Sequence, residues 1–550
     1  MDKRSEGYAL QTQGRHAEAI ACYEQVVARD PGDWEIWNNL GNARRAAGDR
    51  DGAIEALVQA SLIRPDLAAI HYNLGVSLAE AGRFEEAARA FGDAVRIAPD
   101  HPPALLDLAR ALRHCGRHRE ALVSLDRAVQ LAPDLPDLQL ERGRALSGLG
   151  RFDEADQAYR RALTLQPGLA AAFAERGLLL ERGNRLDRLS ALLDEAAAQG
   201  VFDLPYLRAL ALEHEGEFAA ALAEAQAATD DPLRRAALVG RLADKAGDAA
   251  TAFAAFAEMN RVAGEGRPAG AAAYRAHVAA LRDMLTPAYR AGWSDVEPDR
   301  GRPAPVFLIG FPRSGTTLLD TLLMGHPEIR VLEEEPFLQR VGEELGDFAR
   351  LPALGADETN RLRALYFAEL DAFDPQARGK TVIDKLPLNI LGAPLIHRLF
   401  PEAKLIFAAR HPCDVVLSCF MQNFDLNDAM ANFLDIGDAA RLYDLVMSFW
   451  MRARGILPLD VHEVRYEALV EDKAREMRAL IAFLDLPWEE ALLDHQATAA
   501  KRGPIVTPSY AQVAQPIYRR ARGRWERYRD QLEPVLPILA PWAELMGYTT

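Results

Sequence analysis

The first 200 residues repeat one pattern of apolar and polar positions with a period of 34 residues. Apolar residues recur within each period at helical spacing, as in Trp37, Leu40, Ile54, Leu57 and Val58. Small residues and prolines follow the same period in four sets: Gly7, Gly41, Gly75, Gly143 and Gly177; Gly14, Gly48, Gly82, Gly116 and Gly150; Ala19, Ala53, Ala87, Ala121 and Ala155; Pro31, Pro65, Pro99, Pro133 and Pro167. The pattern predicts stacked helix pairs.

Each set has a physical role in such a pair. The first glycine and the alanine are small where two helices cross closely. The second glycine ends the first helix in a left-handed conformation, which costs glycine no Cβ strain. The proline ends the second helix, because it cannot continue the hydrogen-bond ladder.

The W-x-x-L-G pattern at Trp37, Leu40 and Gly41 resembles the tetratricopeptide repeat. The resemblance implies an all-α solenoid over residues 1–203 whose concave face binds a protein or peptide partner. The alternative is an array with a purely structural role, or one that dimerises and so makes the chain a homodimer. We interpret residues 204–300 as degenerate helical repeats, a cap and a linker, since the period decays there.

The pattern changes near residue 301. Residues 306–310 form a short apolar run, followed by helical spacing, and residues 404–410 form a similar run. Residues 381–385 form a short β-like run that ends at Lys385. Short apolar runs between helices are typical of buried parallel strands. We therefore predict an α/β domain over residues 301–550, with a central parallel sheet and helices on both faces.

A glycine-containing loop follows the first strand and has the pattern G-x-x-x-x-G-T-T from Gly310 to Thr317. Backbone N–H groups between a strand and a helix N-terminus are suited to bind phosphate. A nucleotide triphosphatase would carry lysine where Thr316 stands. The cation here is Arg313, inside the loop, so the loop favours a shorter anion.

The run P-R-S-G-T-T, followed by His326-Pro327, resembles the 5′-phosphosulfate loop of sulfotransferases, in particular tyrosylprotein sulfotransferases. The resemblance implies 3′-phosphoadenosine-5′-phosphosulfate (PAPS) as co-substrate and a P-loop-like domain. It assigns the 5′-phosphate and the sulfuryl group to five residues: Arg313, Ser314, Gly315, Thr316 and Thr317. No metal is expected, because the leaving group is only a nucleotide 5′-phosphate.

Arg410 and Ser418 stand eight residues apart, as the arginine and serine that bind the 3′-phosphate do in this family. An arginine at a strand end can give phosphate two parallel hydrogen bonds. The resemblance is looser for Tyr466, Ser509 and Arg524, which we expect to contact the nucleotide.

The resemblance also suggests the catalytic residues. Glu334 stands 21 residues after Arg313, where tyrosylprotein sulfotransferases carry their catalytic glutamate, and Glu333 and Glu335 remain alternatives. Lys385 matches the lysine that contacts the bridging oxygen. The segment around it lacks the histidine base of many cytosolic sulfotransferases, which favours the protein-sulfating branch. We therefore expect Glu334, Lys385 and Arg313 to act in catalysis.

Composition narrows the remaining choices. Lys plus Arg number 64 against 80 Asp plus Glu, and the net charge of −16 disfavours nucleic-acid binding. The four cysteines show no metal-ligand spacing and fit a reducing compartment. We expect a cytoplasmic protein without a membrane anchor, since no stretch approaches eighteen apolar residues.

These observations predict a transferase that moves a sulfuryl group to an acceptor hydroxyl, with protein tyrosine as the first choice. A saccharide, a lipid or a small molecule is the alternative acceptor. Two other functions compete with this one. Asp384 at the end of a strand would suit a P-loop kinase, and a catalytically inactive repeat scaffold is the other alternative.

Overall fold

The computed structural model describes residues 2–229, 231–266, 270–294, 301–501 and 522–549. The chain forms two compact units, Met1–Glu215 and Gly216–Thr550. Their boundary falls inside the 204–300 range, where the sequence period decays. Within the described ranges, no helix combines the length and the apolar character needed to cross a membrane.

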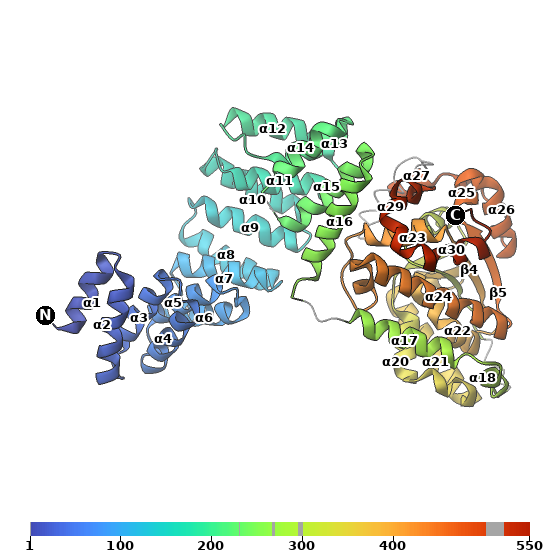
Figure 1. Cartoon of the computed structure of the whole chain (residues 1–550), viewed down its shortest axis with the longest axis horizontal. Helices are drawn as coiled ribbons and strands as arrows, with labels where there is room; N and C mark the ends of the chain where they lie inside the picture. The colour runs from blue at the N-terminus through green and yellow to red at the C-terminus, as the bar shows by residue number, and fades with distance from the viewer. Residues whose placement is uncertain (1, 230, 267–269, 295–300, 502–521, 550) are drawn as a thin grey trace. The chain divides into compact units, whose positions relative to one another are not determined.

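The first unit is entirely helical in its described residues, and successive helices pack as antiparallel pairs (Figure 1). Its helices are α1 (Lys3–Thr12), α2 (His16–Arg29), α3 (Trp34–Ala46), α4 (Arg50–Ile63), α5 (Ala68–Glu80), α6 (Phe84–Ile97), α7 (Pro102–His114), α8 (His118–Leu131), α9 (Pro136–Gly148), α10 (Phe152–Leu165), α11 (Ala170–Arg182), α12 (Leu189–Ala198) and α13 (Pro205–Glu215).

The small residues act as the period predicts. A Cβ on Gly143 would stand 2.3 Å from the Tyr159 ring of the next helix, so only glycine allows this approach. Gly48 has φ +87° after α3, the left-handed conformation expected at a helix end. Ala53 is fully buried in the crossing of α3 and α4. The predicted solenoid is confirmed.

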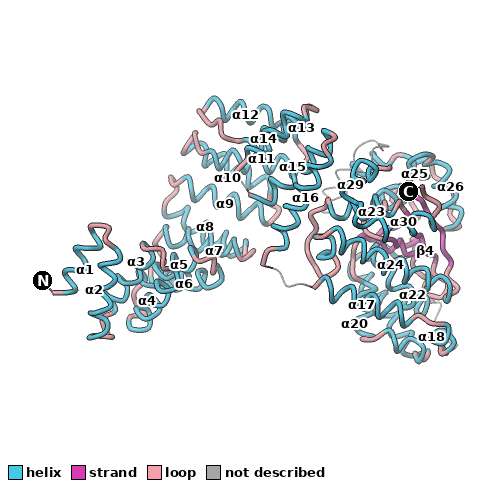
Figure 2. The backbone as a smooth tube through the Cα atoms, viewed as in Figure 1, coloured by secondary structure: helices cyan, strands magenta, loops and turns pink. Residues whose placement is uncertain are grey.

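The second unit contains a five-stranded parallel sheet in the order β2-β3-β1-β4-β5 (Figure 2, magenta). Its strands are β1 (Val306–Gly310), β2 (Ile329–Glu333), β3 (Thr381–Lys385), β4 (Lys404–Ala409) and β5 (Asp460–Arg465). The α/β fold is confirmed, and the strands predicted at 306–310 and 381–385 have the bounds expected. The third predicted strand ends one residue early, at Ala409, where its pairing with Arg465 of β5 ends.

The described helices of the second unit are α14 (Phe218–Ala227), α15 (Pro232–Ala246), α16 (Ala249–Gly264), α17 (Ala271–Met284), α18 (Pro287–Ala291), α19 (Thr316–Leu323), α20 (Phe337–Leu345), α21 (Ala356–Phe373), α22 (Ala393–Leu399), α23 (Pro412–Phe420), α24 (Ile436–Ile456), α25 (Tyr466–Glu471), α26 (Lys473–Phe483), α27 (His495–Lys501), α29 (Arg529–Leu532) and α30 (Leu536–Leu545). Two short 3₁₀ segments border the site described below, η5 (Met430–Leu434) and η8 (Arg524–Tyr528).

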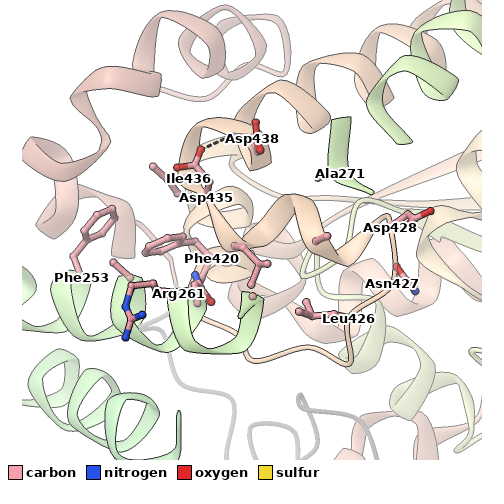
Figure 3. Close-up of a pocket in the computed structure, with 15 residues that line it drawn as sticks. Phe253, Arg261, Ala271, Phe420, Leu426, Asn427, Asp428, Asp435, Ile436 and Asp438 are labelled. Atoms are coloured by element: carbon pink, nitrogen blue, oxygen red, sulfur yellow. Dashed lines mark hydrogen bonds between the residues drawn. The ribbon is translucent and has the colours of Figure 1, made fainter. Parts of the chain in front are cut away.

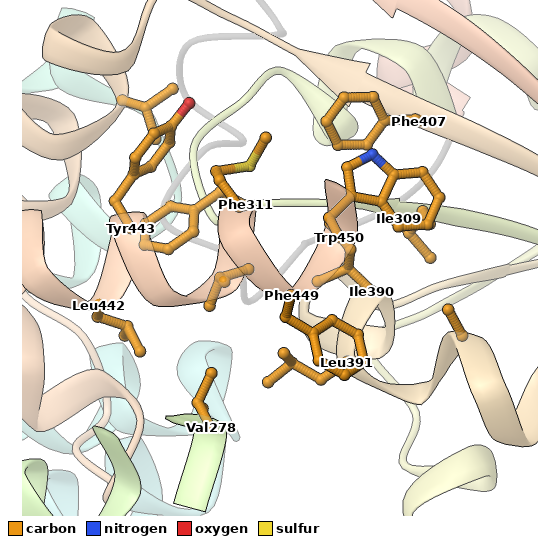
Figure 4. Close-up of a cluster of buried hydrophobic side chains, with 14 of the residues drawn as sticks. Val278, Ile309, Phe311, Ile390, Leu391, Phe407, Leu442, Tyr443, Phe449 and Trp450 are labelled. Carbon is orange, nitrogen blue, oxygen red and sulfur yellow. The ribbon is translucent and has the colours of Figure 1, made fainter. Parts of the chain in front are cut away.

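The larger core lies between one face of the sheet and α24 (Figure 4). Trp450 of α24 packs on Phe407 of β4 with ring centroids 5.2 Å apart, and both rings are buried. Helices that precede the sheet enter the same core through Phe256 and Val278. α16 and α17 are therefore structural parts of the second unit.

Candidate functional site

The candidate site lies where the five parallel strands end. The loop after β1, Glu334 after β2, Lys385 at the end of β3, Arg410 after β4 and Tyr466 after β5 all come to this edge. Strand order reverses at β1, because β2 and β3 lie on one side of it and β4 and β5 on the other. Open parallel sheets bind ligands at such a reversal.

The loop after β1 holds an unusual backbone conformation. Arg313 has φ +69° and Gly315 has φ +101°. A side chain on Gly315 would also be blocked, since its Cβ would lie 2.7 Å from Tyr466 Cδ2. A non-glycine residue such as Arg313 is strained in the left-handed region, and such strain concentrates at functional sites. The loop thus closes tightly over the start of α19.

Two arginines from different strands meet at this loop. Arg313 Nε donates to Ser418 Oγ at 3.1 Å, and Arg410 Nη1 donates to the Arg313 carbonyl at 3.2 Å. The Arg410 guanidinium also lies over the Tyr466 ring, 4.7 Å from its centroid. Burial, together with the positive charges of Arg410 and Arg524, lowers the pKa of Arg313 to about 10. The two guanidinium groups at this loop, Arg313 and Arg410, favour a bound anion.

Hydroxyl groups of the loop complete the cradle. Ser314, Thr316 and Thr317 are buried, and the two threonines begin α19. Ser314 Oγ has no hydrogen-bond partner within the described part of the chain. A buried hydroxyl without a partner is costly, so this one indicates a missing ligand atom. The group therefore fits a phosphate or sulfate.

A buried lysine lies at the end of β3. Lys385 is fully buried and its Nζ contacts Glu334 Oε1 at 2.8 Å, Asp320 Oδ2 at 3.2 Å and Glu333 Oε1 at 3.4 Å. Glu334 has φ +54°, and its N–H donates to the Lys385 carbonyl at 2.7 Å. The structure thus brings the predicted Glu334 and Lys385 into direct contact. Sequence reasoning missed Asp320, which sits inside the apolar pattern of α19.

Asp384 points to the opposite face of the sheet. Its carboxylate accepts from Tyr366 OH at 2.8 Å and Asn389 Nδ2 at 3.2 Å, and burial raises its pKa to about 7. A magnesium ligand would have to face the phosphate loop instead. Within the described ranges, no three His, Cys, Asp or Glu side chains are arranged to hold a metal ion.

The segment around η8 is held beside the site by two carboxylates, of Asp414 and Asp244. Asp414 of α23 accepts from the N–H groups of Gly523 and Trp525, both at 2.9 Å. Arg524 pairs with Asp244 of α15. Neither aspartate was expected from sequence, because each acts on a residue more than 100 positions away. Ser509, the remaining predicted nucleotide contact, lies outside the described residues.

A cavity of about 680 Å³ is lined by residues of α16, the end of α23, η5 and the start of α24 (Figure 3). Its floor includes Phe253 of α16 and Phe420 of α23, whose rings stack with centroids 4.7 Å apart. Asn427 and Asp428 lie on its polar side. The neighbouring residue Cys419 donates through Sγ to the Pro312 carbonyl at 3.3 Å, so α23 connects this cavity to the loop.

Comparisons with known proteins agree with both parts of the chain. Residues 305–490 match the sulfotransferase family, and residues 4–69, 78–140 and 136–168 match tetratricopeptide repeats. An uncharacterized protein of Aquifex aeolicus is 32% identical over 261 residues, which are 44% of this chain and 33% of that protein. The chain thus spans a third of that relative's length.

A protein-tyrosine sulfotransferase of Danio rerio is 26% identical over 263 residues, which are 44% of this chain and 72% of that protein. Among solved structures, a tetratricopeptide repeat protein from Parabacteroides merdae is 16% identical. It aligns with a TM-score of 0.38 over 44% of this chain and 96% of that structure. Residues 305–490 of this chain therefore form a sulfotransferase-family domain, and the helical array before it is built from tetratricopeptide repeats.

Proposed function

We propose that this protein transfers the sulfuryl group of PAPS to an acceptor hydroxyl, most favourably a protein tyrosine. One observation carries the proposal. The carboxyl ends of five parallel strands bring a phosphate-type loop, Arg410, a buried lysine and a glutamate to a single edge. These are the groups that sulfuryl transfer requires: anion binding, a leaving-group cation and a base.

The donor would be held by the loop and the arginines. Ser314, Thr316 and Thr317 offer hydroxyls, and the α19 N-terminus offers N–H groups, to the 5′-phosphosulfate. Arg410 and Ser418, both in contact with Arg313, would bind the 3′-phosphate. Arginine suits this role because its planar fork matches two phosphate oxygens. PAPS supplies an activated sulfuryl group in this arrangement.

Glu334 and Lys385 would act as a coupled pair. Glu334 accepts the acceptor's proton while the acceptor oxygen forms its bond to sulfur and the bond from sulfur to the 5′-phosphate breaks. Of the three carboxylates around Lys385, that of Glu334 is the most exposed, at 45% against 20% and 0%. Once protonated, Glu334 no longer holds Lys385 electrostatically. The lysine can then neutralise charge on the leaving phosphate oxygen together with Arg313.

The acceptor assignment rests on the cavity and on the relatives. An apolar floor made by Phe253 and Phe420 suits an aromatic side chain such as tyrosine. Relatives that are 25–26% identical are named protein-tyrosine sulfotransferases. The tetratricopeptide array would then bind the protein that carries the tyrosine, and we expect the array to affect acceptor binding only.

Two features favour sulfuryl over phosphoryl transfer. The loop has Thr316 where a nucleotide triphosphatase has lysine. Asp384, the candidate magnesium ligand of a kinase, bonds to Tyr366 on the opposite face of the sheet from Lys385.

A thermal shift and a labelling assay test the proposal together. Stabilisation by 3′,5′-ADP without magnesium is expected, whereas stabilisation by ATP with magnesium alone would favour a kinase. Incubation with ³⁵S-labelled PAPS and a cell lysate should then label protein, and alkaline hydrolysis should release tyrosine sulfate. Label confined to saccharide or small molecules would refute the tyrosine assignment. Binding of 3′,5′-ADP without any transfer would favour an inactive scaffold.

A further inference from the structure

One carboxylate in α15 accepts hydrogen bonds from several side chains of a segment nearly 300 residues away. Asp244 Oδ1 accepts from Arg524 Nε at 3.1 Å and from Tyr528 OH at 2.7 Å, and Oδ2 accepts from Arg524 Nη2 at 2.6 Å. Arg527 adds bonds to Asp244 Oδ1 and to its carbonyl, both at 3.1 Å. Asp244 is only 13% exposed, so these bonds are largely shielded from water.

The segment that Asp244 holds also reaches the anion site. Gly523 and Trp525, on either side of Arg524, are fixed by Asp414 of α23, the helix that carries Ser418. The positive charge of Arg524 helps to lower the pKa of Arg313. Arg524 therefore lies between a helix that precedes the sheet and the loop that follows β1.

The way Arg524 is held leaves one edge of its guanidinium available. Its Nε and Nη2 both donate to Asp244, and Nη1 makes no hydrogen bond to any described residue. A guanidinium is a rigid planar fork with five N–H groups, so fixing one edge also fixes the direction of the other. A carboxylate on one edge and a phosphate on the other is a geometry that lysine could not reproduce.

We propose that Asp244 is a positioning residue for donor binding: it holds Arg524 by one edge and thereby presents Nη1 to a phosphate of the 3′-phosphoadenosine nucleotide. This inference rests on the proposed function. It gives α15 a role in the sulfotransferase site, although α15 lies before the segment that matches the family.

A double-mutant cycle in the full-length chain tests the proposal. Asp244→Asn keeps the shape of the side chain but presents an N–H group to an arginine edge that only donates. Calorimetric titration with 3′,5′-ADP should give affinity about tenfold weaker for Asp244→Asn and for Arg524→Ala. The double variant should be no weaker than Arg524→Ala alone, because Asp244 acts through Arg524.

Two matched variants separate positioning from general loss of structure. Tyr528→Phe removes one bond to Asp244 and should leave the affinity within about twofold of wild type. Glu258→Gln, which breaks an exposed ion pair with Arg261 on the neighbouring α16, should do the same. If Asp244→Asn fails to fold, Arg524→Lys replaces it: this variant keeps the positive charge but not the fork, and it should lose about as much affinity as Arg524→Ala.

The possible outcomes have distinct meanings. Unchanged or tighter binding by Asp244→Asn would overturn the proposal, since Asp244 would then be neutral or a competitor of the nucleotide. Losses that simply add in the double variant would overturn it too. If wild type itself does not bind 3′,5′-ADP, the proposed function fails instead, and the two failures are therefore distinguishable.

Discussion

Lys385→Met should destabilise the second unit strongly, through one contact in particular. The lysine Nζ and Asp320 Oδ2 are 3.2 Å apart and both side chains are fully buried. With an effective dielectric constant of about 20, two unit charges at that distance attract by about 5 kcal/mol. Removing one partner of a buried pair costs about 3–5 kcal/mol, because the other charge stays buried without compensation. Glu333 and Glu334 add less, since water reaches them.

Differential scanning calorimetry of the full chain can measure this cost. The transition of the array is identified with Gly143→Ala, which would place a Cβ 2.3 Å from Tyr159 and should lower only that transition. Lys385→Met should lower the other transition by about 5–15 °C. Adding Asp320→Asn should restore at least half of the loss, because both buried charges are then gone. A drop below about 2 °C, or a double variant no more stable than Lys385→Met, would refute this reasoning.

Four further predictions concern other parts of the second unit. Glu334→Gln should lower kcat by about 10²–10⁴ with little change in donor affinity. The kcat of this variant should recover as pH approaches the acceptor's own pKa. Retention of more than a tenth of wild-type kcat would exclude Glu334 as the base. Arg410→Ala should weaken the binding of 3′,5′-ADP about ten- to a hundredfold and the binding of 5′-AMP much less. Equal losses of affinity for the two nucleotides, measured by calorimetry, would show that Arg410 does not bind the 3′-phosphate. The pKa of Asp384 is raised to about 7 when folded, against about 3.9 in an unfolded chain, so its contribution to stability is lost as pH rises from about 4 to 7. Urea unfolding of Asp384→Asn should therefore depend less on pH across that window, and an unchanged dependence would contradict the assignment. Deleting residues 1–215 should leave 3′,5′-ADP binding within about twofold. Deleting residues 1–300 also removes Phe256 and Val278 from the core of the second unit and should impair folding, as circular dichroism would show.

Local patterns were sufficient to predict the parts of the fold that depend on neighbouring residues. The 34-residue period predicted the solenoid, because every repeat makes the same contacts with the next. The apolar run predicted β1 to the residue, because a strand buried on both faces is usually apolar along its whole length. The bounds of β3 were also predicted, although the strand ends in Asp384 and Lys385. The strand β5 was not predicted, since only Val464 among its residues is fully buried and its sequence reads as polar.

The candidate site shows the same division. Arg313, Arg410, Lys385 and Glu334 could be named from motifs, because each lies at the end of a strand or within three residues after it. Asp244 and Asp414 could not, since their partners lie 280 and more than 100 residues away. Neither aspartate differs from a surface carboxylate in its local sequence. Only the packing of α15 and α23 against the segment at 523–528 gives them a role.

The alternation of Asp384 and Lys385 along β3 has a consequence for how the sheet assembles. Val382 and Ile383 are buried in the cores on the two opposite faces of the sheet, so hydrophobic patterning alone would tolerate a shift of one residue against β1 and β2. Such a shift would turn the aspartate toward Asp320 and Glu333, placing three carboxylates together, and would drive the lysine into the apolar layer around Tyr366. Misaligned pairings are thus penalised by charge. Asp384 and Lys385 therefore favour the native register of β3 over shifted registers during folding.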